Sequence, residues 1–192
     1  MKEIDALGLL CPRPVILAKK LIKEENPKEF AVLVDNEIAT ENLSKMADQL
    51  GYDTEVDKEE TVYKVKFKKN GDKKPEQDYS KDEFIVVFSS DELGLGDEEF
   101  SKKLLEGFLY SLSEKDQVPT YVVLYNRGVR LSTINENTVE DLKKLEAKGT
   151  TVLSCGLCLG NYNLKEELKV GQVTNMDRIV DLQIHYRTVK PC

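Results

Sequence analysis

The sequence predicts an α/β protein with two domains: an N-terminal βαβαββ two-layer sandwich and a C-terminal doubly wound, mostly parallel α/β domain. Two observations predict this class. Short apolar runs typical of strands alternate with longer segments whose apolar residues recur at helical spacing. Between the halves, residues 70–82 hold almost no apolar side chain and include Gly71 and Pro75, which is typical of a linker. We therefore expect domains at residues 1–69 and 83–192, joined by a linker at residues 70–82.

The first half is predicted to run strand, helix, strand, helix, strand, strand. We expect the strands at residues 2–5, 30–34, 52–57 and 61–68. In the last of them charged and apolar residues alternate, as in a strand with one solvated face. The first helix should run from Cys11 to about Glu24. The second should follow Asn36 and stop before Gly51, because glycine suits the left-handed residue after a helix.

The second half opens with the apolar run at residues 84–88, which has no polar alternation, as expected of a strand covered on both faces. Strands and helices then alternate, which implies a parallel, doubly wound sheet. The first of these helices should turn an apolar stripe inward, formed by Phe100, Leu104, Leu105, Phe108 and Leu112. We expect further strands at residues 121–125 and 151–154, near Val170 and around 187–190, and helices at 97–113, 138–149, 164–168 and 176–184.

Composition and charge exclude several classes of protein. No apolar run reaches the roughly 18 residues of a membrane span, and the acidic start of the chain does not read as a signal peptide. We expect a cytoplasmic protein without a membrane partner, in which thiols stay reduced. The net charge is −7, and the one basic run, at residues 64–69, reads as the solvated face of a strand, so direct nucleic-acid binding is disfavoured.

One thiol, that of Cys11, stands directly before Pro12, Arg13 and Pro14. A proline fits the first turn of a helix, where N–H groups lack partners. We therefore expect Cys11 at the helix N-cap, where the free N–H groups, the helix dipole and the cation of Arg13 favour a thiolate. The predicted result is a nucleophilic sulfur of low pKa. The residues alone equally permit a small buried cysteine.

Residues 4–15, together with Lys19 and Lys20, resemble the TusA/SirA family of small sulfur carriers, whose signature is Cys-Pro-x-Pro at the start of the first helix. Cys11, Pro12 and Pro14 match that motif. The resemblance implies the βαβαββ sandwich and a persulfide carried on Cys11. Leu7 departs from the pattern, because many members carry an arginine there, and this changes the charge around the thiol.

The second half resembles the DsrE-like domain in four segments, at residues 89–97, 125–129, 154–159 and 171–176. A TusA-like domain followed by a DsrE-like domain is the architecture of YedF-type proteins, a group associated with sulfur transfer and proposed to act in selenium metabolism. The resemblance implies a homo-oligomer held by the C-terminal domain. It also implies a sulfur or selenium donor protein, such as a cysteine desulfurase, and an acceptor that it does not name.

A second thiol centre, Cys155 and Cys158, follows the strand expected at residues 151–154. Open α/β sheets bind ligands at the carboxyl ends of their strands. Two thiols three residues apart suit the attacking and resolving roles in disulfide or persulfide exchange. The pair supplies only two of the four ligands of a structural zinc site, so we expect no metal. The alternative interpretation is that both cysteines are buried and line a hydrophobic core.

Two further residues, His185 and Cys192, would complete a zinc site only if the end of the chain folds back. His185 is the one histidine and has no recognisable orienting partner, so we expect a surface or half-buried structural role. Cys192, the last residue of the sequence, is expected to be mobile and is either a resolving thiol or incidental.

The leading interpretation is a cytoplasmic sulfur or selenium relay that needs no cofactor. Cys11 would accept a persulfide sulfur and pass it to Cys155 or to an outside acceptor. Two alternatives stay open: a redox or regulatory protein with a reversible Cys155–Cys158 disulfide, and a non-catalytic oligomeric scaffold.

Overall fold

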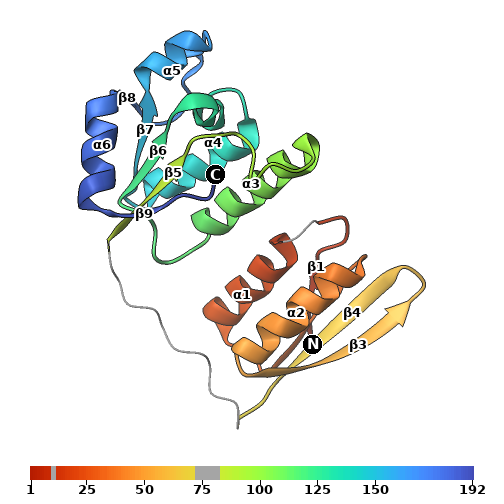
Figure 1. Ribbon diagram of the computed structural model, residues 1–192. Helices are drawn as coiled ribbons and strands as arrows, with labels where there is room; N and C mark the ends of the chain where they lie inside the picture. Colours follow the sequence, from red (N-terminus) through yellow and green to blue (C-terminus); the bar gives the residue numbers. More distant parts are fainter. Residues whose placement is uncertain (10–11, 72–82) are drawn as a thin grey trace. The chain divides into compact units, whose positions relative to one another are not determined.

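The computed structural model describes residues 1–9, 12–71 and 83–192 (Figure 1). The chain divides into two compact units, Met1–Tyr79 and Ser80–Cys192. The linker expected at residues 70–82 lies almost wholly outside the described residues. Among the described residues, no helix is both long and apolar enough to cross a membrane.

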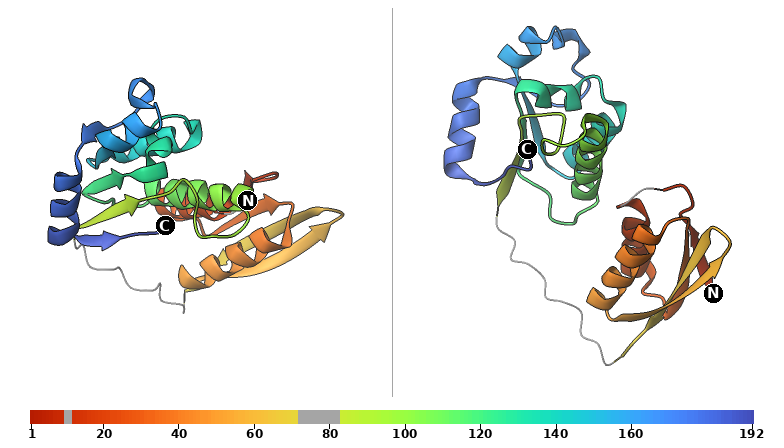
Figure 2. Two further views of the ribbon diagram at one scale, coloured as in Figure 1. Left: turned by 45° about the horizontal axis from the view of Figure 1, so that its top comes forward. Right: turned by 45° about the vertical axis from the view of Figure 1, so that its right-hand side comes forward.

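The first unit is the predicted βαβαββ two-layer sandwich. Its sheet has the order β1-β2-β4-β3, with β1 parallel to β2 and the other pairs antiparallel. Both helices lie on one face of the sheet (Figure 2, right). The strands are β1 (Lys2–Asp5), β2 (Glu29–Val34), β3 (Tyr52–Glu59) and β4 (Val62–Lys69), and the helices are α1 (Arg13–Glu25) and α2 (Glu37–Gln49).

The core of the first unit lies between the sheet and its helices. Phe30 of β2 stacks on Phe67 of β4 with 4.3 Å between ring centroids, and the ring of Tyr52 meets both edge-on. On the other face of β4, Lys64, Lys66 and Lys68 pair with carboxylates of β1, β3 and β2, respectively. The basic run is therefore the solvated face of a strand, as predicted.

The second unit is a three-layer structure around a parallel five-stranded sheet of order β8-β7-β6-β5-β9. Helices α3 (Glu98–Ser113) and α4 (Glu136–Ala147) cover one face, and α6 (Met176–His185) covers the other (Figure 1). The strands are β5 (Phe84–Phe88), β6 (Tyr121–Leu124), β7 (Thr151–Cys155), β8 (Gln172–Thr174) and β9 (Arg187–Val189). Short helices follow β6 and β7: η1 (Asn126–Ser132), α5 (Gly156–Asn161) and η2 (Lys165–Glu167).

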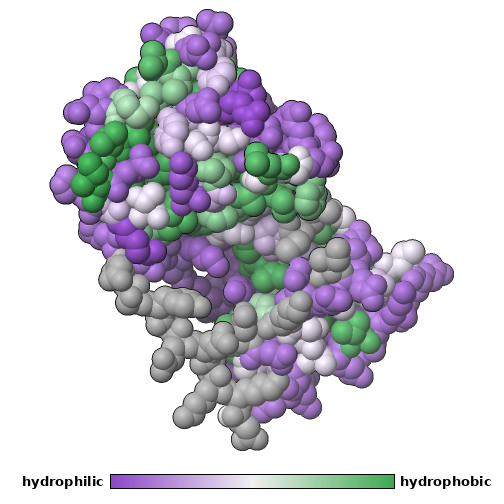
Figure 3. All heavy atoms as spheres, viewed as in Figure 1, coloured by the Kyte–Doolittle hydropathy of each residue, from purple (hydrophilic) through white to green (hydrophobic). Residues whose placement is uncertain are grey.

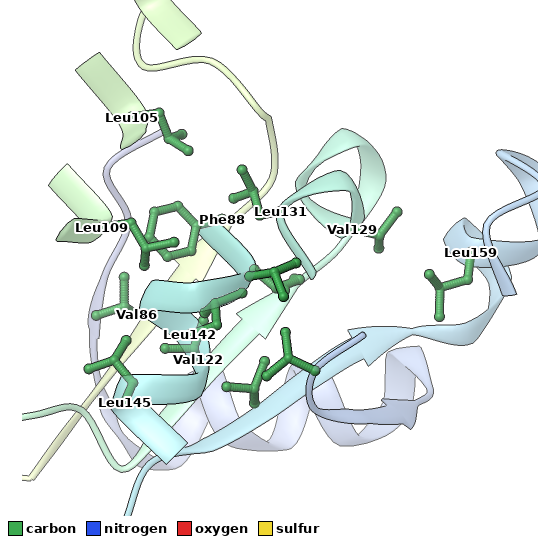
Figure 4. Close-up of a cluster of buried hydrophobic side chains, with 14 of the residues drawn as sticks. Val86, Phe88, Leu105, Leu109, Val122, Val129, Leu131, Leu142, Leu145 and Leu159 are labelled. Carbon is green, nitrogen blue, oxygen red and sulfur yellow. The ribbon is translucent and has the colours of Figure 1, made fainter. Parts of the chain in front are cut away.

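Alternate residues of β5 are buried on opposite faces of this sheet, which explains its unbroken apolar run. Val86 and Phe88 pack against α3 and α4 (Figure 4). Ile85 and Val87 pack against α6 on the other face. The prediction of a strand covered on both sides is confirmed.

The inward face of α3 differs from the predicted stripe. Phe100 is 59% exposed and Leu104 is 40% exposed, whereas Leu105 and Leu109 are fully buried. The buried face of α3 also includes two serines, Ser101, four residues before Leu105, and Ser113, four residues after Leu109. Serine can be buried here because its hydroxyl finds partners; that of Ser113 bonds the carbonyl of Tyr110. Phe108 and Leu112 pack against the core together with Leu105, so the predicted stripe is confirmed at these three positions and wrong at Phe100 and Leu104.

Two further predictions are corrected. Helix α4 starts at Glu136, not at Thr138, because the side chain of Asn135 accepts the Thr138 N–H at 3.2 Å and so caps the helix. The short strand expected near Val170 is β8, which begins two residues later, at Gln172. The helices η1 and α5 had no counterpart in the sequence prediction, and both border the sites described next.

Candidate functional site

The first candidate centre is the start of α1. Cys11 itself lies outside the described residues. The N-cap is Pro12, because its carbonyl accepts the first helical N–H, from Ile16, at 3.1 Å. The prediction that Cys11 occupies the N-cap is therefore wrong by one position. Arg13 is exposed and Pro14 is buried at the first two positions of the helix.

The loop that leads to Cys11 is held by Asp35, which follows β2. The Gly8 N–H donates to the Asp35 carboxylate at 2.8 Å, and Gly8 has a φ of +72°, a conformation that glycine adopts without strain. The Asn36 side chain and this Gly8 N–H lower the pKa of Asp35, because both favour the charged carboxylate. Asp35 was not among the predicted site residues, although a carboxylate directly after a strand is typical of loop anchoring.

The second candidate centre is the thiol pair of the second unit. Cys155 is the last residue of β7 and is fully buried. Cys158 lies in α5 and is half-buried. The two belong to one apolar cluster with side chains of β5, β6 and α6. The structure thus places the pair at the carboxyl end of the strands, as the sequence predicted, but with unequal access to solvent.

Cys158 receives a hydrogen bond from the main chain of Asn126, the first residue of η1. The Asn126 N–H donates to Cys158 Sγ at 3.1 Å. Asn126 has a φ of +51°, which asparagine tolerates better than most residues. Tyr162 fixes its side chain by donating its hydroxyl to Asn126 Oδ1 at 2.7 Å. Neither Asn126 nor Tyr162 was predicted to serve the site.

The Cys158 thiol is subject to opposing influences. Burial raises its pKa, because a thiolate loses solvation there. The Asn126 N–H lowers the pKa by stabilising the charged sulfur, and the neighbouring Cys155 thiol raises it. The net shift is upward, so at rest Cys158 is protonated and becomes nucleophilic on losing its proton.

An ion-pair network ties the loop after β5 to η1. Asp91, whose side chain is 10% exposed, accepts from Arg130 Nη1 at 3.0 Å. Its other oxygen lies 3.1 Å from Arg127 Nε, an ion pair without the alignment of a hydrogen bond. The guanidinium of Arg130 lies over the ring of Tyr162 at 5.4 Å. The network therefore supports the Tyr162–Asn126 contact beside Cys158.

Cys192 and His185 also have defined places. The Cys192 carbonyl accepts the Ser89 hydroxyl at 3.0 Å, and its thiol lies 3.7 Å from the Ser90 carbonyl. Cys192 is thus packed against the loop after β5, contrary to the expected mobile end. His185 is exposed at the end of α6, with Nδ1 2.8 Å from the Asp181 carbonyl, in line with a structural role. Among the described residues, no cluster of three or more histidine, cysteine or acidic side chains is placed to hold a metal.

Comparison with known proteins concerns the first unit. Residues 2–69 match the family model described as "Sulfurtransferase TusA". The chain is 35% identical over 71 residues to a protein of Methanocaldococcus jannaschii named "Putative sulfur carrier protein MJ0990", covering 36% of this chain and 95% of that protein. It is also 44% identical to the crystal structure of a SirA-like protein from Desulfitobacterium hafniense, with a TM-score of 0.34, over 36% of this chain and 99% of that one. Through residues 2–69, the chain therefore belongs to the TusA sulfurtransferase family.

Proposed function

We propose that the chain is a sulfur or selenium relay protein in which Cys11 accepts a persulfide sulfur and hands it to the second unit or to an outside acceptor. Membership of the TusA sulfurtransferase family, together with the Cys-Pro-Arg-Pro motif at residues 11–14, is the observation that carries this proposal. The donor is a persulfide-bearing protein such as a cysteine desulfurase. The reaction takes place in the cytoplasm, where reduced thiols persist.

The transfer is a thiol exchange that needs no cofactor. The Cys11 thiolate attacks the terminal sulfur of the donor persulfide, the donor's S–S bond breaks, and the donor leaves as a thiolate. Cys11 then carries the sulfur as a persulfide. Cys155 and Cys158 supply nucleophiles for the next transfer, at the sheet edge where α/β proteins of this kind place their chemistry.

The second unit is proposed to be a DsrE-like domain that also assembles the protein, giving the chain the YedF-type architecture. Its surface supports this role, since apolar side chains lie exposed on two helices. Phe100 and Leu104 are exposed on α3, and Val180 and Ile184 are exposed on α6. In the view of Figure 3, separate apolar groups reach the surface of the second unit among hydrophilic ones. Exposed apolar groups of this kind favour contact with a second copy.

The test is residue-by-residue mass spectrometry after incubation with a cysteine desulfurase and cysteine. We expect a gain of about 32 Da on Cys11 first. The Cys11→Ser variant should gain no sulfur from the desulfurase, while Cys192→Ser should gain it as the wild type does. Sulfur transfer to Cys11→Ser at the wild-type level would contradict the proposal. A Cys155–Cys158 disulfide without any sulfur on Cys11 would instead favour the redox alternative.

A further inference from the structure

The two thiols of the second unit differ in access, and this difference fixes their order of reaction. Cys155 is fully buried at the end of β7. Cys158 is partly exposed, and the neighbouring Leu157 is 81% exposed, so a donor can approach this turn of α5 from solvent. Of these two thiols, Cys158 is therefore the one that an incoming persulfide can reach.

Cys158 is also the thiol with a preorganised hydrogen-bond donor. The Asn126 N–H reaches its sulfur at 3.1 Å, from a backbone conformation that Tyr162 holds in place through the Asn126 side chain. A donor already aimed at the sulfur stabilises the anion that forms during thiol exchange. Cys155 is the N-cap residue of α5, but its side chain makes no capping hydrogen bond to the helix.

We propose that the pair is a reductive release site, an inference that rests on the proposed relay function. Cys158 accepts the sulfane sulfur as a persulfide, and Cys155 then attacks this persulfide and displaces hydrosulfide. This activity goes beyond carrying sulfur, because it converts a bound persulfide sulfur into free sulfide. With selenium as cargo, the same step frees hydroselenide.

The chemistry balances in two steps. In the first, the Cys158 thiolate attacks the terminal sulfur of the donor persulfide, and the donor leaves as a thiolate. In the second, the Cys155 thiolate attacks Cys158 Sγ, a Cys155–Cys158 disulfide forms, and the terminal sulfur leaves with the bonding electrons as hydrosulfide. That sulfur gains two electrons, which the two cysteine sulfurs lose. A dithiol reductant must then restore the thiols before the next turnover.

The position of Cys155 favours the second step. Cys155 and Cys158 lie in the same apolar cluster, so the attack is intramolecular and gains from proximity. Because Cys155 is closed to solvent, outside thiols cannot reach it to compete. Cys192, the third described thiol, instead points to the Ser90 carbonyl on the loop after β5.

The experiment uses the full chain carrying Cys11→Ser, so that the first unit takes no part. The reduced protein is mixed with one equivalent of glutathione persulfide, free sulfide is trapped with a bimane reagent, and quenched samples are mapped by mass spectrometry. We expect about one sulfide per chain, with the peptide of residues 155–158 about 2 Da lighter than its dithiol form. Early samples should carry about 32 Da extra on Cys158.

Added substitutions separate the two roles. Cys155→Ala should keep the extra sulfur on Cys158 and lower sulfide release at least about tenfold, because the resolving thiol is lost. Cys158→Ala should lower release to the level without protein, and Cys192→Ser should release sulfide as the parent does. Extra sulfur on Cys155 or Cys192 in early samples of the parent, or undiminished release from Cys155→Ala, would overturn the inference. The early samples need no variant, so they decide the order even if Cys155→Ala folds poorly. Failure here leaves the proposed function untouched, because that rests on Cys11.

Discussion

The main-chain N–H of Asn126 donates to Cys158 Sγ across 3.1 Å, and it joins the segment after β6 to the short helix after β7. Because Tyr162 holds the Asn126 side chain, this contact depends on a hydroxyl that does not touch the sulfur. A substitution at Tyr162 can therefore change the effect of the Asn126 N–H on Cys158 without altering the thiol or its burial.

Tyr162→Phe should raise the pKa of Cys158 and slow its alkylation near neutral pH several-fold. The reason is that the Asn126 N–H, which lowers that pKa, loses its support. The measurement is the rate of iodoacetamide reaction against pH in a Cys11→Ser, Cys192→Ser background. Tyr63→Phe, in the first unit, is the matched control and should leave the profile unchanged. An unchanged profile in Tyr162→Phe would mean that Asn126 is held by its backbone alone.

Cys155→Ser should destabilise the second unit by about 1–3 kcal/mol, because it places a hydroxyl in an apolar cluster. Leu157→Ala, at an exposed position of the same turn, should stay within about 0.5 kcal/mol of the wild type. Urea unfolding followed by circular dichroism measures both. Equal stability of the two variants would show that the Cys155 site tolerates a polar group.

Gly128→Ala should cost about 3 kcal/mol or more, because the added Cβ would lie 2.2 Å from the Phe88 carbonyl oxygen. The two nearest atoms, O and C of Phe88, belong to the backbone of the buried strand β5, which leaves little room for relief. Gly96→Ala is the control: its Cβ would meet only the Ser101 hydroxyl, at 3.6 Å, and its φ is not in the left-handed region. A small effect of Gly128→Ala in thermal unfolding would show that η1 shifts to make room.

Asp35 should titrate below its ordinary value of 3.8, since the Asn36 side chain and the Gly8 N–H favour its charged form. A carboxyl whose pKa is lowered by folding contributes stability above its unfolded value and loses it as the pH falls through the folded value. The Gly8 amide resonance should report this midpoint in an NMR titration. In Asp35→Asn the acid transition of Gly8 should vanish, whereas Asp57→Asn should keep it.

Asp35→Asn should also slow sulfur loading of Cys11 several-fold, because the loop before the thiol loses a charge-assisted hydrogen bond. Single-turnover loading from a cysteine desulfurase measures the rate, again with Asp57→Asn as control. Loading at the wild-type rate would show that the Gly8 contact does not position the thiol.

The sequence could predict those elements whose signals are local. The apolar run 84–88, the alternation in β4 and the left-handed Gly51, with a φ of +77°, each need only a few neighbouring residues. The position of Cys155 at the end of a strand followed from the same kind of signal.

Features that depend on distant contacts could not be predicted in this way. The helix η1 requires Gly128 to lie against Phe88, forty residues earlier in the chain. The inward face of α3 includes serines whose burial depends on hydrogen-bond partners. Asn126 acts through its main-chain N–H, which every residue but proline carries, so its side chain gives no direct signal.

The pairing of β9 with β5 has a consequence for biosynthesis. β5 is the first strand of the second unit to leave the ribosome, yet its partner on one side, residues 187–189, is made last. Until then that side of β5 offers unpaired backbone groups in an apolar strand, the kind of edge on which chains aggregate. A nascent or truncated chain that stops before Arg187 exposes this edge, so the synthesis of β9 both completes the sheet and protects it.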